Sequence, residues 1–126
     1  MLNDFQRFSS RDEIGGDKWT AFTPTFTSLT VVGGTSYSGR YRKIGRLVEF
    51  QIQISAATSI ASTAGTTYMS LPAPCKGIAG LVVMTNKTTN ISVGLGHIDT
   101  TNSRCYLPTQ GASGNVFTIF GSYEAE

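Results

Sequence analysis

The stretch Tyr37-Ser-Gly-Arg-Tyr-Arg-Lys-Ile-Gly-Arg-Leu-Val-Glu-Phe-Gln-Ile-Gln-Ile54 decides the fold. From residue 47 onward, apolar and polar side chains alternate, which is typical of a strand with one buried face. The preceding turn, residues 43–46, contains Gly45, which tolerates the positive φ of a tight reversal. We therefore predict a β-hairpin in a sheet that buries one side. The side chains predicted to face the core are Val48, Phe50, Ile52 and Ile54, and those predicted to face outward are Leu47, Glu49, Gln51 and Gln53.

The composition is poor in charge and rich in hydroxyl groups. Charged residues make up 14% of the chain, against roughly 25% in an average globular protein. Thirteen serines and seventeen threonines replace them among the 126 residues, and threonine favours strands. We expect a single domain with hydroxyl-bearing outer faces that other subunits partly cover. The alternative is a monomer kept soluble by hydroxyls and amides.

The net charge of +2 gives no reason to expect nucleic acid or an anionic membrane as a partner. No apolar run approaches the ~20 residues of a membrane-spanning helix, and the first residues lack the layout of a secretory signal. We expect a protein made in a cytoplasm and not inserted into a membrane. In that compartment Cys75 and Cys105 are expected to be buried free thiols, with a disulfide between them as the alternative.

Charge is concentrated at the start of the chain, because residues 1–18 hold seven of the 18 charged residues. With Gly15-Gly16 as a flexible step, this predicts an N-terminal arm, residues 1–18, and a domain, residues 19–126. Leu2, Phe5 and Phe8 recur every three residues, as one side of a short helix does. Because so short a helix is marginal alone, we interpret these three residues as a partner-binding anchor. A frayed terminus is the alternative.

Runs rich in β-formers, separated by Gly, Pro and Asn, predict about eight strands in the domain. No window of ten or more residues there has a helical period, so the fold class is all-β. The spacing favours an antiparallel two-sheet β-sandwich of jelly-roll type over a barrel. Residues 56–65 are interpreted as a loop or a weak edge strand. The expected strands span residues 25–32, 36–43, 46–55, 66–71, 78–85, 91–98, 104–107 and 116–123.

The sequence contains no recognisable set of catalytic or metal-binding residues. His97 and Asp99 would share one side of a strand, but no G-x-S-x-G turn accompanies them, and we interpret them as satisfied polar groups near a strand end. Glycoside cleavage requires two carboxylates across a groove, and Glu49 lies on the outer side of the hairpin. One histidine, two distant cysteines and four scattered aspartates offer no metal-ligand cluster. We expect no enzymatic activity, no metal and no cofactor.

Two groups of residues suggest ligands other than substrates. The basic residues between Arg40 and Arg46 lie beside Tyr37 and Tyr41 and suggest single-stranded nucleic acid. On a hairpin, however, Arg40 and Arg42 would face away from both tyrosines. We therefore expect inward tyrosines and a solvated basic face, with pairing to acids of a neighbouring subunit as a further option.

Sugar binding is the second suggestion, because the apolar faces of sugar rings pack on aromatic side chains. Trp19, Tyr106 and the loops rich in serine and threonine are the candidates for it. For Trp19 we expect instead an enclosed aromatic residue that seals one end of the sandwich.

Four pieces of the sequence, taken in order, resemble the C-terminal head domains of bacteriophage tail fibres and minor tail proteins. They span nearly all of residues 19–126, and their order and spacing carry the resemblance. It implies a non-enzymatic β-sandwich head, usually a homotrimer, whose distal loops contact the host surface. It assigns no individual receptor residue. The pieces are Trp19-Thr-Ala-Phe-Thr-Pro-Thr-Phe26, Gly39-Arg-Tyr-Arg-Lys-Ile-Gly-Arg-Leu-Val-Glu-Phe50, Met69-Ser-Leu-Pro72 and Gly121-Ser-Tyr-Glu-Ala125.

The arm is a departure from tail fibres, in which a long shaft and an attachment domain precede the head. A head on a short arm also looks like a capsid decoration or cement protein. We expect a structural protein of the virion, a trimeric tail-fibre knob for host attachment, joined through residues 1–18 to other virion proteins, with a host-surface glycan as a further partner. Capsid decoration and a free carbohydrate-binding module are the alternatives.

Overall fold

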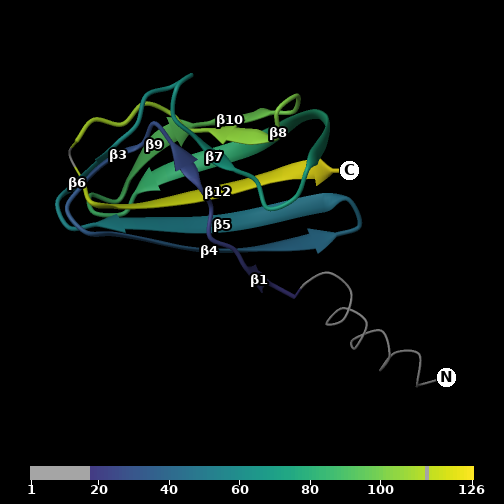
Figure 1. Ribbon diagram of the computed structural model, residues 1–126, viewed down its shortest axis with the longest axis horizontal. Coiled ribbons are helices and arrows are strands. Elements are labelled where there is room, and N and C mark those ends of the chain that lie inside the picture. Colours follow the sequence, from purple (N-terminus) through teal and green to yellow (C-terminus); the bar gives the residue numbers. More distant parts are fainter. Residues whose placement is uncertain (1–17, 113) are drawn as a thin grey trace.

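The computed structural model describes residues 18–112 and 114–126 (Figure 1). These residues form antiparallel sheets, which confirms the predicted all-β class. The proposed anchor residues Leu2, Phe5 and Phe8, and nearly all of the arm, lie outside the described residues. No described segment forms a helix suited to crossing a membrane.

The largest sheet has six strands, and its last strand in sequence, β12, lies in its interior. In spatial order the strands are β1 (Thr20–Ala21), β4 (Thr35–Ile44), β5 (Leu47–Ala56), β12 (Val116–Ala125), β8 (Cys75–Asn86) and β9 (Ile91–Leu95). A four-stranded sheet has the order β10 (His97–Asp99), β11 (Arg104–Tyr106), β7 (Tyr68–Ser70) and β2 (Phe26–Thr27). A third, two-stranded sheet pairs β3 (Thr30–Val32) with β6 (Ser59–Ala61).

The predicted hairpin is formed by β4 and β5. Their register runs from Thr35↔Ala56 to Ile44↔Leu47, and Gly45 in the connecting turn has a φ of 62°. The prediction for the buried side is confirmed, because the four side chains assigned to it are at most 2% exposed. Tyr37 and Tyr41 pack against the core from β4, as predicted.

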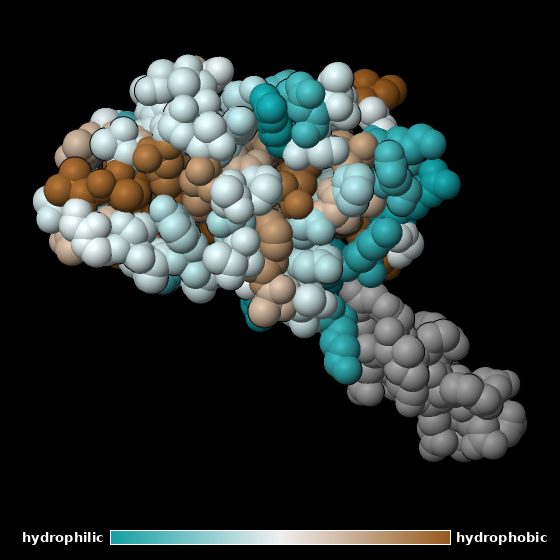
Figure 2. Space-filling view, viewed as in Figure 1, coloured by the Kyte–Doolittle hydropathy of each residue, from teal (hydrophilic) through white to brown (hydrophobic). Residues whose placement is uncertain are grey.

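One hydrophobic core is shared by the sheets. The six-stranded sheet contributes alternate residues of β5, β8 and β12, while Met69, Ile98 and Cys105 come from the four-stranded sheet and Ile60 from β6. Because these residues alternate with outward-facing ones, each sheet has one buried face and one outer face. Figure 2 shows that weakly polar, pale-coloured residues cover much of one side of the molecule, with apolar residues gathered at the end where β3 and β6 lie.

Two segments that were each predicted to form one continuous strand are divided into two strands in the structure. Residues 25–32 form two strands, β2 and β3, in different sheets, and Ser28 between them has a φ of 60°. Residues 91–98 likewise divide at Gly96 into β9, which pairs with β8, and β10, which pairs with β11. Together with the short strands β1 and β6, these divisions give the described chain twelve strands instead of about eight. Within residues 56–65, the weak edge strand is present as β6.

The central strands approach closely at Gly121, which is paired with Phe50 across β12 and β5. The ring of Phe50 occupies the space where a side chain at position 121 would begin, and the carbonyl oxygen of Leu81 lies 2.8 Å from that same position. Glycine is therefore required here by packing, because any Cβ would displace a buried ring and a strand.

We predict that Gly121→Ala destabilises the domain by about 1–3 kcal/mol, the usual cost of overpacking a core. Urea unfolding measures this as a lower midpoint. Ser122→Ala, one position along on the outer side, is the control and should change stability by less than about 0.5 kcal/mol. Equal midpoints for Gly121→Ala and the wild type would contradict the close packing of Phe50 on β12.

Candidate functional site

The outer face of the four-stranded sheet carries two cross-strand rows of polar and aromatic side chains. Directly paired residues project to the same side of a sheet. Between these rows, Met69, Ile98 and Cys105 are buried in the core. One row contains most of the aromatic rings, and the other contains the arginine. The first row consists of Thr27, Tyr68, Tyr106 and His97. The second row consists of Ser70, Arg104 and Asp99.

The rings of the first row contact one another. The centroids of Tyr68 and Tyr106 are 5.3 Å apart with planes inclined by 43°, and those of Tyr106 and His97 are 6.3 Å apart. The guanidinium of Arg104 lies 4.3 Å from the centroid of Tyr68, and its Nη1 donates a long hydrogen bond of 3.5 Å to the hydroxyl of Tyr106. We call this surface, formed by Tyr68, His97, Arg104 and Tyr106, the aromatic–arginine face.

A hollow of about 240 Å³ adjoins the aromatic–arginine face. Its walls carry hydroxyl groups held in place by the backbone. Ser70 Oγ accepts a hydrogen bond from the amide of Thr25 and Ser103 Oγ accepts one from the amide of Cys75, both at 2.9 Å. The lining residues are Thr25, Thr27, Tyr68, Met69, Ser70, Asn102, Ser103 and Arg104.

Asp99 has a structural role at the end of β10. Its carboxylate accepts hydrogen bonds from the backbone amides of Thr101 (3.0 Å) and Asn102 (3.2 Å), and from the side-chain amide of Asn102 (3.0 Å). These bonds, the side-chain bond first, lower the pKa of the Asp99 carboxyl. Asp99 therefore shapes a turn, as a satisfied polar group near a strand end was predicted to do. The imidazole of His97 lies against the ring of Tyr106.

Trp19 lies on the outer face of the six-stranded sheet, so the prediction that it seals one end of the sandwich is wrong. The guanidinium groups of Arg40 and Arg42 lie 4.5 and 4.9 Å from its ring. Strand β1 pairs with this part of β4 and brings the indole onto the arginine side. The sequence analysis placed the hairpin's own tyrosines correctly, but this aromatic residue comes from outside the hairpin.

The two arginines beside Trp19 already have polar partners. Arg42 Nε forms an ion pair with Glu49 Oε1 at 2.8 Å, and Arg40 donates two hydrogen bonds to Gln51 Oε1 at 3.1 and 3.2 Å. Their donors are thus partly used within the sheet. This arrangement supports the interpretation of a basic outer face and does not resemble a groove prepared for phosphates.

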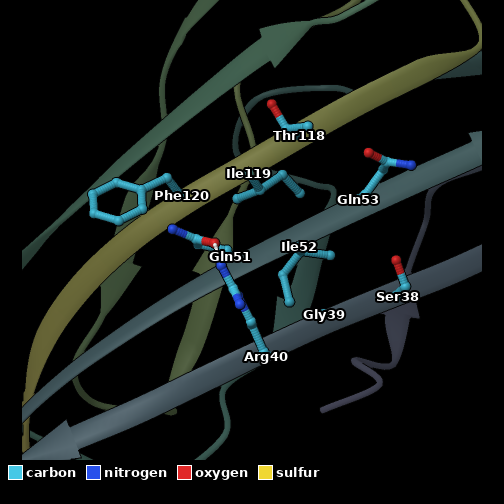
Figure 3. A pocket seen from close by; sticks show the side chains of 9 residues that line it. All are labelled: Ser38, Gly39, Arg40, Gln51, Ile52, Gln53, Thr118, Ile119 and Phe120. Carbon is cyan, nitrogen blue, oxygen red and sulfur yellow. Dashed lines mark hydrogen bonds between the residues drawn. The ribbon is translucent and has the colours of Figure 1, made fainter. Parts of the chain in front are cut away.

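The middle of this sheet has a second hollow, of about 470 Å³, with walls of amides, hydroxyls and apolar carbons (Figure 3). Figure 3 shows Gln51 between Arg40 and Phe120, with Thr118 and Gln53 further along the same strands. The lining residues are Ser38, Gly39, Arg40, Gln51, Ile52, Gln53, Thr118, Ile119 and Phe120.

Apolar side chains continue from Phe120 across β8 and β9. The register Phe120↔Val83↔Leu95 puts these three on the outer side, and Leu81 lies two residues from Val83. Phe120, Leu81 and Leu95 are 39%, 48% and 69% exposed. We call the part of this outer side formed by Leu81, Val83, Leu95, Thr118 and Phe120 the charge-poor face.

Both cysteines are buried free thiols, as predicted. Burial raises the pKa of Cys105 to about 12 and also raises the pKa of Cys75, with a smaller contribution from Glu124. Thiolates are the reactive form of cysteine, so neither side chain is suited to nucleophilic or redox chemistry. Among the described residues, no three His, Cys, Asp or Glu side chains are grouped to hold a metal ion.

Sequence analysis singled out Tyr106 and His97 separately and did not bring them together with Tyr68 and Arg104. The only local signal was the spacing of Arg104 and Tyr106, which places both on one side of a short strand. Comparison with known proteins gave no matching family model and no significantly similar curated protein or solved structure.

We predict that neither thiol reacts with a chromogenic disulfide reagent in the native protein at mildly alkaline pH, because burial disfavours both thiolates. After unfolding in concentrated guanidinium chloride, two thiols per chain should react. Rapid modification of native Cys105 would contradict its placement in the core, and fewer than two thiols after unfolding would indicate a disulfide.

Proposed function

We propose that the chain is a non-enzymatic structural protein of a bacteriophage virion. It is made in the host cytoplasm and forms a trimeric knob on the tail fibre that takes part in host attachment. Residues 1–18 anchor the knob to other virion proteins. The observation that carries this proposal is the charge-poor face, an outer sheet surface whose chemistry suits contact with another copy of the chain.

The charge-poor face has the composition of a protein interface. Interface centres are depleted in charged residues and enriched in aromatic ones, and contiguous exposed apolar patches mark association sites. Here Phe120, Leu81 and Leu95 are exposed together. Charged groups on the same side lie at the margins, with Glu49 paired to Ser122, Glu124 at the end of β12, and Lys87 bonded to Gln53 beside Thr118. Three copies related by a threefold axis could bury this face in a closed ring.

The strand order is consistent with a two-sheet β-sandwich of jelly-roll type, which we propose as the finer description of the fold. Strand β12 pairs with β5 and with β8, its neighbours in space and not in sequence. Such insertion of a late strand between earlier ones is expected of Greek-key connections. The shared core, to which both larger sheets contribute, also supports this description.

The pieces of sequence that resemble tail-fibre heads belong to the framework of the domain. Trp19–Phe26 includes β1 and the start of β2, Gly39–Phe50 includes the hairpin turn, and Gly121–Ala125 ends β12. Within these pieces, Tyr123 donates a hydrogen bond of 2.7 Å to the carbonyl of Ala73 and accepts one of 3.0 Å from its amide. The resemblance therefore supports a common architecture and does not indicate the receptor.

A capsid decoration protein is the second candidate, because the charge-poor face would suit contact with a shell protein as well as with another copy of the chain. Copy number in purified virions separates the two locations. Hundreds of copies per particle indicate the capsid, and a handful to a few dozen indicate the tail.

We predict that the wild-type chain has a mass by light scattering of about three times 13.5 kDa, as a closed trimer requires. Phe120→Glu should reduce it to that of one chain, because a carboxylate would lose its hydration in the interface. Ile44→Glu, at a similarly exposed apolar residue beside the hairpin turn, is the matched control and should remain trimeric. A monomeric wild type at micromolar concentration would refute the trimer.

We predict that removal of residues 1–18 leaves a folded knob that no longer joins the particle. Circular dichroism checks the fold, and the protein content of purified particles checks incorporation. Full-length chains with Leu2, Phe5 and Phe8 all changed to alanine should fail in the same way if these side chains form the anchor. Normal incorporation of the truncated protein would disprove the anchoring role.

A further inference from the structure

We infer that the aromatic–arginine face binds a saccharide carrying a carboxylate group, with Tyr106 as the surface for the sugar ring and Arg104 as the partner of the carboxylate. This site lies on a different sheet from the charge-poor face. Its use in host attachment rests on the proposed function, whereas the binding itself is a property of the chain alone.

The face is built on strands and is held in place before any ligand arrives. Tyr68, Arg104 and Tyr106 are half-buried, and each is flanked by core residues of its own strand. The rings also support one another across β7, β11 and β10. Because these side chains are already ordered, little conformational entropy would be lost on binding.

Arg104 differs from Arg42 and Arg46 in having no ion pair within the described part of the chain. Arg42 and Arg46 are paired with Glu49 and Glu124, at 2.8 and 3.8 Å. The guanidinium of Arg104 lies instead over Tyr68 and has one long hydrogen bond to a neutral hydroxyl. A guanidinium stacked on a ring keeps its edge donors available, and their spacing matches the two oxygens of a carboxylate.

The hollow beside Arg104 offers hydroxyl donors. Ser70 Oγ and Ser103 Oγ each accept a hydrogen bond from a backbone amide. Each hydroxyl therefore keeps its own hydrogen to donate to a ligand. The nearest carboxylate, that of Asp99, already accepts three hydrogen bonds from its turn. A donor-rich hollow favours a ligand with an anionic acceptor beside hydroxyl groups.

The size and charge of the face favour a sugar over a nucleic acid. A hollow of about 240 Å³ is slightly smaller than the usual range for small-molecule sites, and suits one residue of a longer saccharide. Tyr68 and Tyr106 already contact each other, so a base cannot insert between them. Arg104 is the only arginine or lysine on the face, whereas single-stranded nucleic acid is bound along a continuous basic groove.

The test is a titration of the full-length chain with a matched pair of probes, oligosaccharides of glucuronic acid and of glucose, followed by calorimetry and ligand-observed NMR. We expect the acidic oligosaccharide to bind at least about tenfold more tightly, since hydrogen bonds to charged groups are worth about 1.5–3 kcal/mol. Arg104→Gln should reduce its affinity to that of the neutral probe, and Tyr106→Ala should abolish binding of both.

Arg40→Gln is the matched control, because it removes another guanidinium that lies over an aromatic ring, on the other sheet. It should leave binding unchanged. Absence of binding to the acidic probe at millimolar concentration, or equal binding of both probes that Arg104→Gln does not alter, would overturn the inference. Binding of oligothymidylate that Tyr106→Ala abolishes would assign the face to nucleic acid instead. The oligomeric state and particle assembly are measured separately, so failure here leaves the virion proposal intact, and the reverse also holds.

Discussion

The fold depends on the position of the last strand in the middle of the largest sheet. β12 pairs with β5 on one side and with β8 on the other, and places Phe117, Ile119 and Tyr123 in the core. The Tyr123 hydroxyl bonds to both backbone groups of Ala73, and burial raises its pKa well above the usual range. Without β12, β5 and β8 would each have an unpaired edge and an exposed apolar face. The core therefore closes only when the final residues are in place.

The alternation that builds this core also produces two outer faces of different chemistry. On the large sheet, the middle of the outer side of β12, β8 and β9 holds hydroxyls and apolar side chains. On the small sheet, the outer positions hold two tyrosines, an imidazole and an arginine. The two faces belong to different sheets. Under the proposed function, assembly and recognition would therefore use side chains of different sheets.

The sequence was informative wherever the structure is set by neighbouring residues. The hairpin of β4 and β5, its turn at Gly45 and its four core side chains follow from a local period of two and one glycine. The same reasoning could not divide residues 91–98, because alternation does not reveal which sheet a residue joins. Gly96, where the chain passes from β9 to β10, continues the β pattern without a visible break.

The aromatic–arginine face was harder to predict from the sequence, because local alternation does not reveal which strands pair. Tyr68 and Tyr106 are 38 positions apart and meet only through the pairing of β7 with β11. Trp19 was misplaced because its position depends on the pairing of β1 with β4, and two residues of strand give little signal. A cluster that forms by pairing of strands far apart in the sequence produces no periodic pattern in the sequence. Tyr106 could therefore be identified as a candidate, but its neighbours in space could not.

The location of Trp19 gives the molecule a built-in optical probe. It is the only tryptophan of the chain, so all indole emission comes from one place. That place is next to the start of the described residues and beneath the two guanidinium groups of β4. Any event that pulls on the chain ahead of β1 changes the surroundings of this indole first. Its fluorescence therefore reports on the β1 edge of the six-stranded sheet, without an added label.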